Sequence, residues 1–131
     1  MIEITFEGGK VVTAHVNGHT IRTDQPIENG GTNSAPSPFD LFLASIGTCA
    51  GVYVKSFCDN RQIPSEGIRL LETMEIDPEK KIPSVFKIEI ELPPDFPEKY
   101  RDAVISVADL CLVKKTILNN PKIIVSARIK Q

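Results

Sequence analysis

The residues best suited to chemistry are three cysteines, Cys49, Cys58 and Cys111. The thiolate is the nucleophilic form of cysteine, and an ordinary thiol with a pKa near 8.5 is only about 3% ionised at pH 7. Cys49 and Cys111 are each expected on the apolar face of a long helix, so their side chains could meet. A disulfide between them would need α-carbons within about 7 Å of each other. The sequence leaves that distance open.

Cys58 follows Cys49 by nine residues on the same expected helix. At about 100° per residue, this spacing places the two side chains on opposite sides of the helix. We therefore expect Cys58 to be a packing residue or a thiol at the solvent edge.

A reactive Cys49 needs a group that stabilises its negative charge. Its own helix dipole is a poor candidate, because the dipole's effect fades beyond the first turn and Cys49 lies about three turns in. A cation from elsewhere is expected, and Arg22 is the best one available; the alternative is an ordinary surface arginine on a strand edge. Lys114 and Lys115 could act on Cys111 in the same way, or be surface lysines at a helix end.

His15 and His19 flank a turn, and neither they nor the cysteines have the spacing of zinc ligands. No glycine-rich phosphate loop, Gly-x-Ser-x-Gly elbow or dinucleotide fingerprint is present. We expect neither a metal nor another cofactor.

The helix that carries Cys49 begins at Ser37-Pro38-Phe39-Asp40. Ser37 fits an N-cap, Pro38 the first helical position, and Asp40 an acid that returns a hydrogen bond. Residues 41–54 include no charged side chain, so other elements or a second chain must cover every side. The run is shorter than the roughly 20 apolar residues of a membrane span, which predicts a buried core helix.

Gly47 and Gly51 flank Cys49 in the helix interior, where each glycine costs about 1 kcal/mol relative to alanine. They suggest close approach of another backbone, or room around the thiol.

The pattern along the chain predicts an α+β domain. Alternating segments and an Asn-Gly turn predict a three-stranded N-terminal meander over 2–6, 11–16 and 19–23. A long loop leads to the central helix, which ends near 61–62. Strands over 68–76 and 85–92 form a hairpin, a second helix begins within 93–97 and stops at 119–121, and a last strand covers 123–129.

Length and charge narrow the class of protein. The 131 residues suit one domain, 1–131. Seventeen acidic against fifteen basic residues, with no basic stripe, argue against nucleic acid as a partner. The start lacks the layout of a signal peptide and no membrane span is predicted, so we expect a cytoplasmic protein with reduced cysteines.

The segments around two cysteines resemble the OsmC/Ohr family of osmotically inducible and organic-hydroperoxide-resistance proteins. The resemblance rests on residues 37–49 (SPFDLFLASIGTC) and 111–118 (CLVKKTIL), and the order of elements matches along the whole chain. It implies an intertwined homodimer with each central helix in the shared core and the active sites near the interface. The chain looks most like the less characterised OsmC-like branch.

The resemblance also implies a thiol-dependent peroxidase. Cys49 would attack the peroxide, Cys111 would resolve the sulfenic acid as a disulfide, and a lipoyl-type or small-thiol reductant would restore both thiols. Arg22 would stabilise the thiolate and Asp40 would orient Arg22. Apolar Phe39, Phe42 and Tyr53 would favour organic hydroperoxides as substrates.

Two positions depart from the better-characterised peroxidases of the family. Phe39 stands where they have a glutamate, with Asp40 one residue later, and Leu112 follows the second cysteine in place of their usual proline. An alternative hypothesis is therefore a non-catalytic protein that binds a small apolar or thiol ligand at the dimer interface. A purely structural role for all three cysteines is the remaining alternative.

Overall fold

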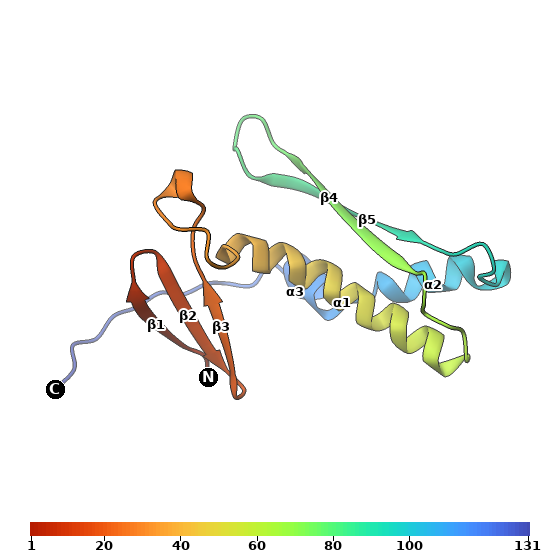
Figure 1. Ribbon diagram of the computed structural model, residues 1–131, viewed down its shortest axis with the longest axis horizontal. Helices are drawn as coiled ribbons and strands as arrows, with labels where there is room; N and C mark the ends of the chain where they lie inside the picture. The colour runs from red at the N-terminus through yellow and green to blue at the C-terminus, as the bar shows by residue number, and fades with distance from the viewer. The chain divides into compact units, whose positions relative to one another are not determined.

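The computed structural model describes residues 1–131, which form two compact units, Met1–Ser45 and Ile46–Gln131. The first unit contains an antiparallel sheet in the order β1 (Glu3–Gly8), β2 (Val11–Val16) and β3 (His19–Thr23), as Figure 1 shows. Asn17 and Gly18 have φ of 49° and 80° in the β2–β3 turn. These positive values suit the tight hairpin turn that Asn-Gly favours, so the predicted meander is confirmed.

The loop after β3 is organised around one buried carboxylate. Asp24 is only 1% exposed and accepts hydrogen bonds from the backbone and side chains of its own loop. Gly31 packs tightly in this loop, because a β-carbon there would lie 2.0 Å from the Gln25 carbonyl oxygen. A short 3-10 turn, Ile27–Asn29, completes the segment.

Helix α1 (Pro38–Asn60) begins as the sequence predicts. The Asp40 N–H donates to Ser37 Oγ and the Ser37 N–H donates to Asp40 Oδ2, both at 3.2 Å. This reciprocal pair satisfies two N–H groups at the helix start. The helix ends before Pro64, which disfavours helical backbone at the residue preceding it.

By length and composition, the 23 residues of α1 are enough to cross a membrane. The helix is longer than the uncharged run 41–54, and the mean hydropathy of its most apolar window is 1.5. The core helix of a soluble protein meets the same criterion.

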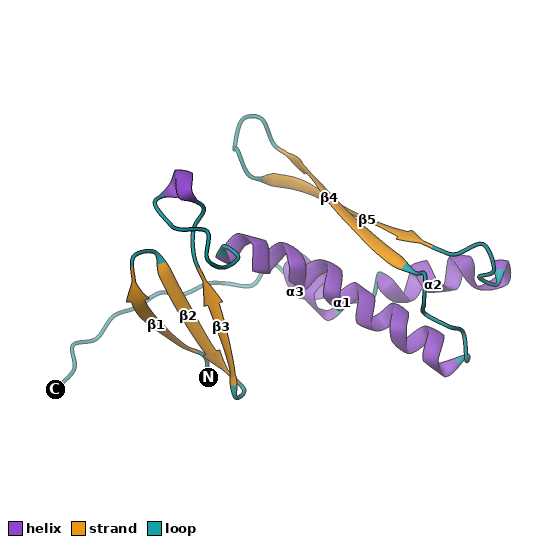
Figure 2. Ribbon diagram, in the orientation of Figure 1, coloured by secondary structure: helices purple, strands orange, loops and turns teal.

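The second unit packs one side of α1 against a hairpin and a second helix. The antiparallel hairpin consists of β4 (Arg69–Ile76) and β5 (Pro83–Glu91), and α2 (Arg101–Ala108) follows the 3-10 turn Glu98–Tyr100 (Figure 2). The most buried side chains of this core are Val54, Phe57 and Cys58 of α1 and Val104 of α2. Partly buried hydrophobic side chains surround them, among them Leu70 and Ile90 of the hairpin.

One face of α1 has no cover within a single chain. Thr48 is exposed, and Val52 is 62% exposed although it is aliphatic. Of the two glycines beside Cys49, Gly47 leaves room for the carboxylate of Glu72, because a β-carbon there would lie 2.5 Å from Glu72 Oε1. A β-carbon on Gly51 would meet nothing within 4 Å.

The single second helix that the sequence predicts is divided in two. It ends at Ala108, and α3 (Leu112–Leu118) begins after a break. Cys111 lies in this break with φ of −56° and ψ of 137°, an extended conformation that no α-helix contains. The helical periodicity correctly predicts which residues lie on the buried side. It cannot show a break at which the Cys111 side chain accepts a backbone hydrogen bond in place of a helical carbonyl.

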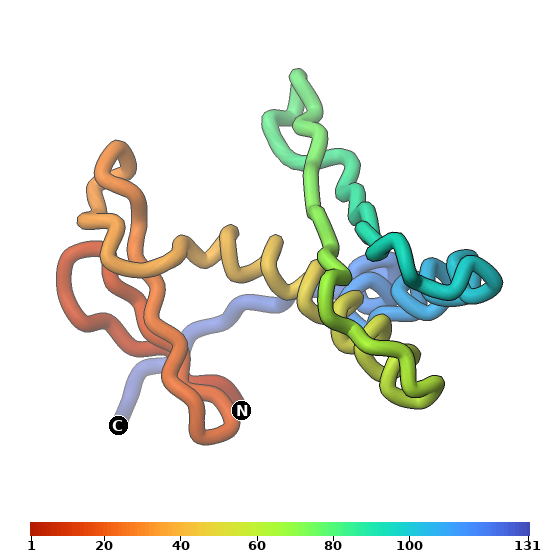
Figure 3. Tube along the Cα trace, turned by 45° about the vertical axis from the view of Figure 1, so that its right-hand side comes forward, coloured from red at the N-terminus to blue at the C-terminus, as the bar shows by residue number.

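The predicted last strand over 123–129 is not formed. Residues 121–131 are exposed, and the chain runs there as an extended trace without helix or strand (Figures 2 and 3). A strand needs a neighbour for its backbone hydrogen bonds, and no strand of this chain pairs with the segment. The alternation of Ile123, Val125, Ala127 and Ile129 remains as a pattern without a partner.

Candidate active site at the start of helix α3

The first turn of α3 directs its backbone N–H groups at two sulfur atoms. The first helical bond runs from the Lys115 N–H to the Cys111 carbonyl, so the amides of Leu112, Val113 and Lys114 have no acceptor in the helix. The Lys114 N–H donates to Cys111 Sγ at 3.3 Å, which makes Cys111 the N-cap. The amides of Val113 and Leu112 act on Cys49, where they lower the pKa of the thiol.

These donors lower the pKa of the Cys49 thiol below its ordinary range. The Val113 amide has the largest effect, and the Cys111 thiol and the Leu112 amide add to it; partial burial opposes them. Cys49 is half-buried, so it combines donors that favour the thiolate with access from outside the protein. Backbone amides, which no charge pattern reveals, therefore supply within this unit the stabilisation that we expected only from a cation.

Cys111 is in the opposite state. It is 1% exposed, and burial raises the pKa of its thiol. The hydrogen bond with Cys49 and the negative charge of the Cys49 thiolate raise it further, against the amides of Lys114 and Val113. The pair thus consists of one thiol with a lowered pKa and a neighbour with a raised pKa.

Cys58 has no such partner. It is 0% exposed within the apolar core, and burial raises the pKa of its thiol. This environment agrees with the packing role expected from its position on α1.

Arg22 and Asp40 both lie in the N-terminal unit, but they do not pair with each other. Arg22 donates from Nη1 to Ser34 Oγ at 3.0 Å, and its Nε lies 3.6 Å from Glu7 Oε2. Asp40 is engaged by Ser37 at the helix start. The predicted role of Arg22 at Cys49 stays a prediction, and the expected orientation of Arg22 by Asp40 has no contact behind it.

The lysines after Cys111 do not act on it through their ammonium groups. Lys114 contributes its backbone amide, while its Nζ forms an ion pair with Asp109. Lys115 is exposed.

The predicted substrate-binding aromatics occupy separate places on α1. Phe39 and Phe42 stack on each other with ring centres 5.7 Å apart, and they are 45% and 39% exposed. Tyr53 is half-buried in the second unit.

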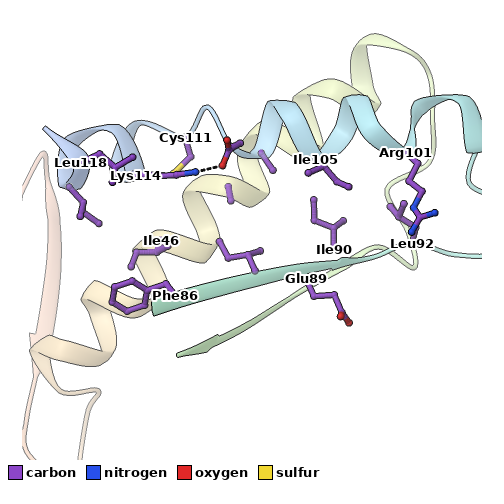
Figure 4. A pocket seen from close by; sticks show the side chains of 15 residues that line it. Ile46, Phe86, Glu89, Ile90, Leu92, Arg101, Ile105, Cys111, Lys114 and Leu118 are labelled. Carbon is purple, nitrogen blue, oxygen red and sulfur yellow. Dashed lines mark hydrogen bonds and ion pairs between the residues drawn. The ribbon is translucent and has the colours of Figure 1, made fainter. Parts of the chain in front are cut away.

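A cavity of about 670 Å³ lies within the second unit, beside Cys111 (Figure 4). Figure 4 shows β5 along one side and α2 and α3 along the other, with α1 crossing behind and Phe86, Ile90 and Ile105 among the labelled side chains. The lining is mainly apolar, and its charged groups are Glu89, Arg101, Asp109 and Lys114. Sequence reasoning missed this cavity, because it is bounded by four elements whose packing the pattern does not fix.

No group of three histidine, cysteine or acidic side chains is arranged to hold a metal ion.

The structure is that of a small α+β protein whose central helix carries Cys49 beside Cys111, the N-cap residue of α3. The chain belongs to the OsmC-like protein family, whose family model matches residues 31–126. No curated protein sequence matches the chain.

Several solved structures share the fold. A protein of Psychrobacter arcticus 273-4, provisionally described as an osmotic stress induced and detoxification response protein, is 24% identical with a TM-score of 0.73, covering 88% of this chain and 85% of its own. The organic hydroperoxide resistance protein OsmC of Legionella pneumophila is 20% identical with a TM-score of 0.54, covering 92% and 90%. The organic hydroperoxide resistance protein OhrB of Bacillus subtilis is 18% identical with a TM-score of 0.51, covering 92% of each chain. These likenesses confirm the predicted α+β fold.

Proposed function

We propose that the protein is a thiol-dependent peroxidase that reduces organic hydroperoxides with Cys49 and Cys111. The observation that supports this most directly is the asymmetry of the two thiols, because amides lower the pKa of Cys49 while burial raises that of Cys111. The names of the hydroperoxide resistance proteins that share the fold indicate which peroxides to test.

The reaction has three steps. The Cys49 thiolate attacks the peroxide, the O–O bond breaks, and an S–O bond forms; the departing alkoxide takes a proton and leaves as the alcohol. The Cys111 sulfur then attacks the sulfenic acid of Cys49, which gives a disulfide and water. An external dithiol, of the lipoyl type or a small thiol, supplies two electrons and two protons and restores both thiols.

The remaining site residues have supporting roles in this proposal. Arg22 stabilises the thiolate and the departing oxygen. The apolar surfaces of Phe39, Phe42 and Tyr53 favour an organic substituent on the peroxide. Asp40 acts mainly as the capping acid of α1, because its side chain is held by the Ser37 amide.

The working form in this proposal is a cytoplasmic homodimer. The uncovered face of α1 and the unpaired alternating segment 121–131 both lack a partner within the chain, and a second copy would supply one to each. Light scattering after gel filtration should give twice the mass of one chain. A monomeric mass at micromolar concentration would contradict the dimer.

The first experiment measures consumption of cumene hydroperoxide with excess dithiothreitol, comparing the wild type with Cys49→Ser and Cys111→Ser. Turnover should vanish in Cys49→Ser. Cys111→Ser should still consume one equivalent of peroxide and accumulate the sulfenic acid, which dimedone labels. Absence of turnover in fully reduced wild type would overturn the peroxidase.

The cavity beside Cys111 favours a second candidate, a protein that binds a small apolar or thiol ligand without turnover. At about 670 Å³, the cavity falls within the range typical of small-molecule sites. Native mass spectrometry of the purified protein would reveal a retained ligand. A bound ligand in a protein that is inactive towards peroxides would support this candidate over the peroxidase.

A further inference from the structure

Arg22 shares one face of the N-terminal sheet with three other polar side chains. It lies directly opposite Thr13 across the β2–β3 pair, and Thr13 lies opposite Thr5 across the β1–β2 pair. Glu7 follows Thr5 by two residues and therefore falls on the same face. Its carboxylate accepts a hydrogen bond from Thr13 Oγ1 at 2.5 Å and lies 3.6 Å from Arg22 Nε.

The backbone sets Glu7 apart from its neighbours in β1. The register shifts between Phe6 and Gly8, so Glu7 has no paired residue on β2, and Gly8 adopts a φ of 119°. Such a bulge in a strand commonly redirects a side chain. Thr13 is 2% exposed, so the Glu7 carboxylate is anchored to a buried hydroxyl rather than to solvent.

The other side of the guanidinium is held from the loop after β3. Arg22 Nη1 donates to Ser34 Oγ at 3.0 Å, and that hydroxyl donates to Asp24 Oδ2 at 2.6 Å. The Ser34 N–H also donates to Asp24 Oδ2 at 3.0 Å. Because the proton of Ser34 is committed to the buried carboxylate, only its lone pairs face Arg22.

An isolated ion pair between half-exposed side chains holds its partners weakly. Here a carboxylate on a strand and a hydroxyl on a loop bind the same guanidinium at Nε and Nη1, and each acceptor is tied to a buried group. This arrangement leaves the outer N–H groups of Nη1 and Nη2 for another oxygen or sulfur anion. A guanidinium binds such an anion best when its plane is already fixed.

We propose that Glu7 and Ser34 are the positioning residues of Arg22, and that they hold its guanidinium plane ready for the anion it serves. This inference rests on the proposed function, in which Arg22 stabilises the charge that develops during attack on the peroxide. Asp40 does not take this role, since its carboxylate caps α1.

The experiment uses the full chain with Glu7→Gln and Ser34→Ala. Glu3→Gln is the matched control, because Glu3 lies on the same strand and face, is exposed, and forms no ion pair. The rate of Cys49 oxidation by cumene hydroperoxide should fall about fivefold in Glu7→Gln, the upper end of what an ion pair at a half-exposed site contributes. The rate at which dithiothreitol reduces the preformed disulfide should be unchanged. A general structural defect would change this rate as well. Ser34→Thr, which keeps the hydroxyl, should retain the wild-type rate.

A second readout does not depend on peroxidase activity. Phenylglyoxal modifies accessible arginines, and mass spectrometry reports its rate at Arg22. That rate should rise severalfold in Glu7→Gln and Ser34→Ala and stay unchanged in Glu3→Gln. If Glu7→Gln matches Glu3→Gln in arginine modification, the positioning role is overturned. If the wild type reduces no peroxide while the arginine result holds, the proposed function fails and the positioning of Arg22 stands.

Discussion

Cys49 and Cys58 lie on the same helix but in opposite chemical surroundings. Cys49 is half-buried, and the amides in the first turn of α3 lower its pKa. Cys58 is fully buried among apolar side chains, and its pKa is raised. The difference shows that neither the residue type nor the helix sets the direction of the pKa shift. What sets it is whether backbone N–H groups of another element act on the sulfur.

The comparison also separates the effect of burial on a thiol from the effect of nearby amides. Burial penalises the charge of both thiolates, but at Cys49 the amides of Val113 and Leu112 outweigh the penalty. Amides at the start of a helix have no acceptor of their own, so binding a sulfur anion costs the fold no existing hydrogen bond. At Cys58 no donor is present to offset the loss of water.

The largest expected effect is on alkylation by iodoacetamide in the folded, reduced protein. Because the thiolate is the reacting form, Cys49 should react at neutral pH with a midpoint below the ordinary thiol range. Cys58 should react at least about 1,000-fold more slowly, since it must wait for the protein to open. Peptide mass spectrometry at timed quenches measures both rates. Comparable rates at the two cysteines would contradict the comparison.

Replacing Cys58 should affect stability and leave chemistry intact. Cys58→Ser buries a hydroxyl in the apolar core and should lower the free energy of unfolding by about 1–3 kcal/mol. Peroxide turnover below the melting transition should remain within about twofold of wild type, because the residue is remote from the thiol pair. Urea denaturation and the cumene hydroperoxide assay measure the two quantities. Cys58→Ala is the control that removes the sulfur without adding a polar group.

Replacing Leu112 tests the amide donors directly. Leu112→Pro removes one of the N–H groups that lower the pKa of Cys49, and proline is favoured at the first position of a helix. The fold should tolerate it, because Cys111 already has the extended conformation, φ −56° and ψ 137°, that precedes proline. Alkylation of Cys49 at pH 7 should slow about 3- to 10-fold, the value of one ordinary hydrogen bond.

Leu112→Ala is the matched control for that substitution. It shortens the exposed side chain but keeps the amide, so Cys49 should react at the wild-type rate. An equal loss in both variants would assign the effect to the leucine side chain, and the amide explanation would be wrong.

The sequence predicts the elements of this chain better than the contacts between them. The Asn17-Gly18 turn and the Ser37–Asp40 cap were predictable because each depends on residues close together in the chain. The break before α3 was not, because it requires the Cys111 sulfur to replace a helical acceptor for the Lys114 amide. The extended state of residues 121–131 could not be predicted either, since alternation specifies a strand but not its partner.

The candidate site shows the same division. The helix periodicity indicated that Cys49 and Cys111 could meet. The separate argument from the helix dipole pointed to a cation for the thiolate and missed the Leu112 and Val113 amides. A backbone donor is invisible in residue types, although the absence of proline after Cys111 does make Leu112 a donor. The role of Asp24 in its loop could have been predicted, because the loop contains the hydroxyl donors Thr32 and Ser34 and both bind the Asp24 carboxylate.

The smallest expected effect concerns Glu72, an ionisable residue of β4 whose carboxylate lies against Gly47 of α1. Its carboxyl has one amide partner, at Gly47, and burial outweighs that bond and raises its pKa. The folded state therefore holds the proton of Glu72 more tightly than the unfolded state does. The stability that protonated Glu72 contributes is complete below its pKa in the unfolded state. This stability is lost as the pH rises through its pKa in the folded state. Glu72→Gln should raise the free energy of unfolding at pH 7 by less than about 1 kcal/mol, with no gain near pH 3. Glu75→Gln on the same strand is the control, since Glu75 is exposed and pairs with Lys87. Equal responses of the two variants at both pH values would show that burial against α1 carries no penalty for an anion, and the contrast between Cys49 and Cys58 would need another cause.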